Sequence, residues 1–193
     1  EPGVSIKPYP CGILTHPTMD LMLRLVTQAD VKPEEIDTIT IHAGTNILKP
    51  IRYPIAANHL QAKFSLPAEV SMIALRRQAG KHEFSDEFVA SDAMQAMQRR
   101  VRTVFDPAIE AKGFDKVRSR ISITRRDGSV VEGWADERYR GGPDNPMSDA
   151  EVEQKLRSCC EGVLDSAAQD RLIAFVWALP EAADATGLTA LLP

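Results

Sequence analysis

Residues 117–137, VRSRISITRRDGSVVEGWADE, contain two apolar segments joined by a tight turn. In the first segment Ile121 and Ile123 alternate with polar residues, which is the period-two pattern of a half-buried strand. Asp127-Gly128 is a preferred two-residue turn between antiparallel strands, so Ser129–Glu137 is expected to return as the second strand. The stretch therefore predicts a β-hairpin.

A third strand is predicted at Ile36–Ala43, where Ile39 and Ile41 alternate with threonine and histidine. The next stretch, Gly44–Pro67, contains three prolines and has little periodicity, so most of it is expected to be a long loop. Long loops inside a compact domain are usually functional, which makes this one the first place to look for site residues.

Helices are predicted on both sides of the loop. Apolar residues between Met19 and Val26 recur at helical spacing, just after Pro17, a favourable first helical residue. Strands and helices follow one another without strict alternation, so the predicted fold class is α+β. The expected helices begin near Pro17, span about Ala68 to Gln78, and follow the candidate N-caps Ser85 and Ser91, the last reaching about Val104.

Gly141–Pro146 interrupts all periodicity and predicts a boundary, with an α+β domain over residues 1–142 and C-terminal helices over 143–193. Ser148 and Glu151 have the spacing of a capping box that opens a helix. A last helix is expected over about Asp165 to Ala178. These two helices have no sheet to cover, so their apolar faces are expected to need chain that lies outside this sequence.

Composition excludes several classes of function. The net charge of −4 argues against nucleic acid as a partner, and no apolar run is long enough to span a membrane. Three cysteines, two of them adjacent, favour a reducing, cytoplasmic location over a disulfide framework, and no spacing typical of a metal site is present. Cys159 and Cys160 are expected to be buried, unreactive thiols.

Three ordered stretches resemble the MmgE/PrpD family, which includes 2-methylcitrate dehydratase and cis-aconitate decarboxylase. KPYPC at residues 7–11, continuing to THP at 15–17, is similar to the first motif of the family. AKFSLP at 62–67 and GPDNPMSD at 142–149 are similar to two further motifs. Each piece is weak alone, but their order and spacing together are specific and cover nearly the whole chain.

The resemblance implies a lid-type α+β domain followed by helices that pack on an all-helical domain missing from this chain. Because the sequence begins at Glu1 without an initiator methionine, we expect a fragment, inactive by itself. The resemblance also implies a homodimer and a small carboxylate substrate, handled without a metal or organic cofactor. The family activities are dehydration, decarboxylation and epimerisation, which all need cations and proton carriers beside a carboxylate.

Site residues follow from the same motifs. The resemblance implies catalytic roles for Lys7, in a proline-stiffened segment, and for Tyr53, in the long loop. His16 is a candidate proton carrier, with capping of the first helix as the alternative. Arg52 is a candidate clamp for a substrate carboxylate, with a surface salt bridge as the alternative. Lys63 is a candidate substrate-binding residue or a structural one.

One position departs from the family pattern. Gly12 stands where the decarboxylases have a histidine, five residues after the site lysine, which makes decarboxylation less favoured than dehydration. An isomerase or epimerase of the family, and a binding or assembly module that has lost the chemistry, are the remaining alternatives. An iron–sulfur dehydratase is disfavoured because the three cysteines lack cluster-ligand spacing.

Overall fold

The computed structural model describes residues 3–192, which divide at the Pro146–Met147 bond into two compact units, here called unit 1 and unit 2. Unit 1 contains a four-stranded sheet with the strand order β2-β1-β3-β4. β1 runs parallel to β2 and antiparallel to β3, which pairs with β4. The strands are β1 (Ile36–Ala43), β2 (Val101–Phe105), β3 (Ser119–Arg125) and β4 (Val130–Trp134).

Seven helices among the described residues of unit 1 complete the α+β fold, as predicted. Ser65, Ser85 and Ser91 each accept a backbone N–H at a helix start, so the two serines expected as N-caps are confirmed. The helices are α1 (His16–Gln28), α2 (Thr45–Leu48), α3 (His59–Ala62), α4 (Leu66–Arg76), α5 (Asp86–Ala90), α6 (Asp92–Gln98) and α7 (Pro107–Glu110).

The strand β2 corrects one prediction. The helix expected to continue to about Val104 ends at Gln98, and the chain then pairs with β1, placing Val101 opposite Ile39. Residues 101–105, VRTVF, are mostly β-branched or aromatic, and such residues pack well on a pleated surface. Pairing with a distant strand therefore determined the local structure. The sheet is mixed, because β2 pairs in parallel whereas the other strand pairs are antiparallel.

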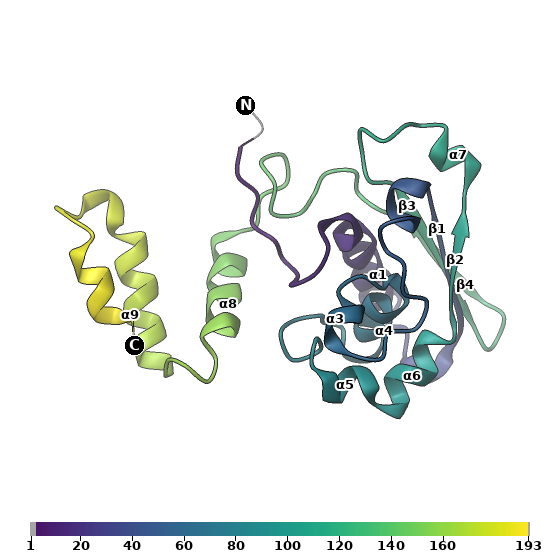
Figure 1. Ribbon diagram of the computed structural model, residues 1–193, viewed down its shortest axis with the longest axis horizontal. Coiled ribbons are helices and arrows are strands. Elements are labelled where there is room, and N and C mark those ends of the chain that lie inside the picture. Colours follow the sequence, from purple (N-terminus) through teal and green to yellow (C-terminus); the bar gives the residue numbers. More distant parts are fainter. Residues whose placement is uncertain (1–2, 193) are drawn as a thin grey trace. The chain divides into compact units, whose positions relative to one another are not determined.

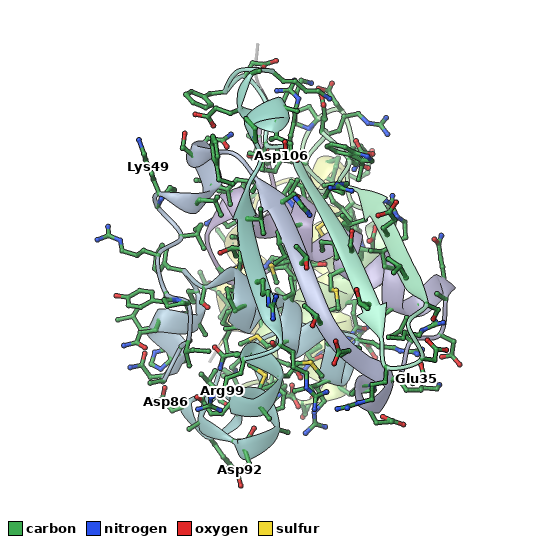
Figure 2. All side chains as sticks on the ribbon, turned by 90° about the vertical axis from the view of Figure 1, so that its right-hand side faces the viewer. Glu35, Lys49, Asp86, Asp92, Arg99 and Asp106 are labelled. Carbon is green, nitrogen blue, oxygen red and sulfur yellow. The ribbon has the colours of Figure 1, made fainter. Side chains whose placement is uncertain are left out.

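The core lies on one face of the sheet. Ile41 of β1 and Ile121 of β3 are fully buried there, together with Met22 of α1 and Ile73 of α4. Figure 1 shows α1 and α4 on this side of the sheet. Figure 2 looks onto the opposite face, with Asp106, just after β2, near one end of the strands and Glu35, just before β1, near the other. The sheet thus has one apolar and one polar face.

Unit 2 consists of α8 (Asp149–Cys160), α9 (Ser166–Trp177) and two short 3-10 segments, Leu179–Glu181 and Thr186–Leu191. The predicted capping box is present, because Ser148 accepts from the Glu151 N–H and the Glu151 carboxylate accepts from the Ser148 N–H. The prediction of buried thiols is wrong in this unit, since Cys159 is exposed and Cys160 is half-buried. Within residues 3–192, every helix is too short or too polar to span a bilayer.

Candidate functional site

A pocket of about 580 Å³ in unit 1 collects much of what the sequence singled out. It lies where the segment before α1 meets the loop after α2. Phe64, just before the start of α4, completes its wall. Most of its walls are apolar, and its polar side chains are a guanidinium and a phenol. The lining residues are Gly12, Ile13, Leu14, Pro50, Ile51, Arg52, Tyr53 and Phe64.

Two backbone hydrogen bonds hold these segments together. The Gly12 N–H donates to the Lys63 carbonyl at 3.1 Å, and the Tyr53 N–H donates to the Phe64 carbonyl at 3.3 Å. The dipeptide Lys63-Phe64 therefore ties both pocket segments to the turn before α4. Ser65 caps α4 by accepting from the Ala68 N–H at 3.1 Å, so the anchor is itself fixed by a buried cap.

Lys7 does not line the pocket but is bonded to the segment that does. Its ammonium donates to the Cys11 carbonyl at 3.2 Å, one residue before Gly12, while the side chain remains exposed to solvent. Arg52 and Tyr53 line the pocket directly, and the Tyr53 ring is 37% exposed. Lys63 contributes its backbone carbonyl, but its side chain is not among the lining groups.

The cations near the pocket are not neutralised by the protein. Among residues 3–192, Lys7, Arg52 and Lys63 form no ion pair with a carboxylate, which argues against the surface salt bridge considered for Arg52. A guanidinium and an ammonium that form no ion pair with a carboxylate favour an anionic ligand. The arrangement suits a small carboxylate better than a neutral molecule.

A buried network fixes the segment that carries Lys7. The Tyr9 hydroxyl donates to an Asp20 carboxylate oxygen at 2.7 Å, and the same oxygen accepts from Arg140 at 2.9 Å. The Arg140 guanidinium also lies over the Tyr9 ring, 5.3 Å from its centroid. Burial, reinforced by the Asp20 charge, raises the pKa of Tyr9, so this phenol stays protonated and acts as a structural anchor.

His16 is placed differently from the other candidates. It is the first residue of α1 and only 1% exposed, and its ring meets the Tyr9 ring edge-on with centroids 5.4 Å apart. The N-cap position belongs to Thr15, so the alternative that His16 caps the helix is wrong. The imidazole lies inside the core, outside the set of side chains that line the pocket.

Glu69, in the first turn of α4, is a buried acid that the sequence reasoning missed. Its carboxyl group is fully buried beside the Cys11 thiol and the Thr15 hydroxyl, which both interact with it. Burial raises the pKa of Glu69 well above its ordinary value, so the group is held as a neutral acid. A glutamate one turn into an apolar helix was the available signal, but sequence alone does not show which face is covered.

Metal ligands do not gather at this pocket or elsewhere in the described chain. Among residues 3–192, no three His, Cys, Asp or Glu side chains form a group that could hold a metal ion. Burial raises the pKa of the Cys11 thiol, which disfavours the thiolate that metal binding or nucleophilic attack would need.

Comparison with curated proteins gave no match to this chain. A comparison with family models gave one for residues 9–181, more than half of the sequence. The matched segment contains the whole pocket lining and begins two residues after Lys7. Members of this family are generally lyases or dehydratases. The chain belongs to the MmgE/PrpD family, and the matched region is the family's C-terminal domain.

Proposed function

We propose that this chain is the substrate-covering part of a cofactor-independent lyase that dehydrates a polycarboxylate or hydroxy acid. The observation that supports the proposal is the pocket lined by Arg52 and Tyr53, together with the Lys7 ammonium that donates to the carbonyl one residue before the lining residue Gly12. These side chains offer two positive charges and one phenol, and all three remain exposed to solvent. A cover that excluded water from the mostly apolar pocket would reduce the screening of these charges and strengthen their attraction for an anion.

Each group has a role that fits dehydration. The reaction takes a proton from a carbon beside a carboxylate and a hydroxyl group from the neighbouring carbon, leaving a double bond and water. Arg52 would hold a carboxylate with two parallel N–H donors, and Lys7 would stabilise the negative charge that grows on it. Tyr53 would donate to the departing hydroxyl or relay the proton.

The pocket is open, and the proposal includes a cover. Ile13 and Phe64 on its rim are 36% and 43% exposed, an amount of apolar surface that a covering domain would bury. We expect an all-helical domain of the same protein, working as a homodimer, to supply that cover and the remaining acid/base groups. Excluding water would strengthen every charge interaction inside the pocket.

A second candidate is a carboxylate-binding module without catalysis. The burial of His16 favours it, because the structure removes one predicted proton carrier from the pocket. Because the Gly12 side chain cannot transfer a proton, decarboxylation by a histidine at this position is less favoured than dehydration.

Turnover by the complete protein tests the proposal. Lys7→Met and Tyr53→Phe are expected to lower kcat/KM by roughly 10²–10⁴-fold, the usual effect of removing an acid/base or electrostatic group. Suitable substrates are citrate, 2-methylcitrate and cis-aconitate, followed through the absorbance of the unsaturated acid. Lys116→Met, an exposed lysine outside the pocket lining, is the matched control and should leave turnover unchanged.

Two results separate the candidates. If both variants lose turnover and keep their affinity for the substrate, the lyase is supported. If the unaltered protein binds these acids but converts none of them, the chain is a binding module.

A further inference from the structure

Glu69 takes no part in the proposed reaction, but it contacts both ends of one pocket wall. Residues 12–14 line the pocket, and the residues on either side of them are Cys11 and Thr15. The fully buried carboxyl group of Glu69 interacts with the Cys11 thiol and with the Thr15 hydroxyl. One acid in the first turn of α4 therefore reaches both residues that bound this wall.

The Thr15 hydroxyl determines what the acid has to supply. It donates to the Gly12 carbonyl at 2.8 Å, and the Thr15 N–H donates to the same carbonyl at 3.1 Å. The Cys11 and Met19 sulfur atoms lie farther from the hydroxyl oxygen, at 3.6 and 3.7 Å. A hydroxyl group has one proton, so once this proton is given to Gly12 the hydroxyl oxygen can only accept from Glu69.

The carboxyl group of Glu69 can act as this donor. Because burial raises the pKa of Glu69 well above its ordinary value, the group keeps its proton. A neutral carboxylic acid offers one O–H donor for Thr15, and its second oxygen can accept from the Cys11 thiol, a weak donor. An ionised carboxylate could only accept, and it would compete with the Gly12 carbonyl for the Thr15 proton.

The same wall is connected to other parts of the candidate site. The Gly12 N–H donates to the Lys63 carbonyl at 3.1 Å, and the Cys11 carbonyl accepts from the Lys7 ammonium at 3.2 Å. A shift of residues 11–15 would therefore move the pocket lining and the attachment point of Lys7 together.

We propose that Glu69 is a positioning residue that, as a neutral acid, holds residues 11–15 in place by donating to the Thr15 hydroxyl. It does not touch the ligand and acts through Thr15, which fixes the Gly12 carbonyl. Its effect on binding rests on the carboxylate site of the proposed function. Its effect on residues 11–15 requires no ligand, so the two can be measured separately.

Amide hydrogen exchange of the complete protein measures residues 11–15 without a ligand. The amides to follow are those of Gly12 and Thr15, whose backbone hydrogen bonds fix this wall. Glu69→Met has a side chain of similar length that cannot donate, and it is expected to speed exchange of both amides roughly tenfold, as the loss of one buried hydrogen bond should. Glu69→Gln keeps an N–H donor and a carbonyl acceptor and should leave both rates within about twofold.

Affinity for tricarballylate, a polycarboxylate that has no hydroxyl group to lose, measures the consequence for the candidate site. Calorimetry should show binding weakened about tenfold in Glu69→Met and changed by no more than about twofold in Glu69→Gln. Ile73→Val removes one methyl group from a fully buried position of the same helix and is the control for a general loss of stability. It should speed exchange equally throughout the core of unit 1 and leave the affinity unchanged.

Thr15→Val tests the route by which Glu69 acts. It removes the hydroxyl group and should by itself speed exchange and weaken binding by about the same tenfold factor. Combining it with Glu69→Met should add no further loss, because both changes break the same connection. Thr15→Val also keeps the test decisive if Glu69→Met does not fold, which thermal unfolding would reveal.

The outcomes separate this inference from the proposed function. Unchanged exchange in Glu69→Met, faster exchange with unchanged affinity, or equal effects of Glu69→Met and Glu69→Gln overturn the role of Glu69. Losses that multiply in the double variant overturn the route through Thr15. Faster exchange of the two amides, in a protein that binds no polycarboxylate even when unaltered, would reject the proposed function and keep Glu69 as the residue that holds this wall.

Discussion

Unit 1 and unit 2 differ in how much apolar surface each buries by itself. In unit 1 the side chains of Met22, Ile41 and Ile73 are fully buried. In the described part of unit 2 only Leu172 and Ile173 are below a tenth exposed, while Trp177 on the same helix is 49% exposed. Helices therefore form in both units, but unit 1 alone has an extensive core. Caps and periodicity can specify a helix, whereas stability needs the second layer that unit 2 lacks.

The largest expected effect contrasts a buried side chain of unit 1 with an exposed one of unit 2. Ile41→Ala should lower the free energy of unfolding of unit 1 by about 2–5 kcal/mol, because it leaves a cavity in the middle of the sheet. Val176→Ala in α9, where the side chain is 38% exposed, should change stability by less than about 0.5 kcal/mol. Urea unfolding followed by circular dichroism measures both. Equal losses would show that unit 2 has a core of its own.

A second contrast concerns pH and compares Glu69 with Glu181, an exposed carboxylate of unit 2. Because burial raises the pKa of Glu69, the native state keeps a proton that the unfolded chain releases above about pH 4.5. Stability is therefore lost as the pH rises from that value toward the raised pKa of the folded state. Glu69→Gln removes this loss, so its stability relative to the unaltered protein should grow with pH, at most by about 1.4 kcal/mol per pH unit.

Thermal unfolding between pH 4.5 and 8 is the measurement for this pair. Glu181→Gln, the same substitution at an exposed position, is the control. If the difference for Glu69→Gln does not vary with pH, the prediction for the buried carboxyl group is wrong.

The smallest expected effects come from the helix caps. Ser65→Ala in unit 1 should cost about 1–2 kcal/mol, because the Ala68 N–H that it leaves without a partner is buried. Ser148→Ala, at the exposed start of α8, should cost only about 0.5–1 kcal/mol, since water can replace the lost acceptor. Denaturant midpoints of the two variants give the comparison, and a larger loss for Ser148 would contradict it.

The sequence was sufficient wherever the signal was local. The Asp127-Gly128 hairpin, the serine caps and the Ser148 capping box all depend on residues within a few positions of one another. It failed at β2, whose residues 101–105 became a strand by pairing with β1, far away in the chain. Helix patterns describe one segment at a time and contain no information on such a partner.

The candidate site also has features that the sequence alone predicts and features that depend on the folded core. Lys7, Arg52 and Tyr53 could be proposed from the sequence because motifs and spacing are read along the chain, and the structure places Arg52 and Tyr53 in the lining of one pocket. Burial is a property of the folded core, which is why the interior positions of His16 and Glu69 could not be predicted.

The central position of β1 has a consequence for biosynthesis. Both neighbours of β1 in the sheet lie later in the chain, so β1 leaves the ribosome before either of them has been made. Until β2 and β3 follow, two strand edges and the isoleucines of β1 are exposed on the nascent chain, which favours pairing with other nascent chains. The production of soluble protein should therefore depend on chaperones and on the speed of translation between β1 and β3.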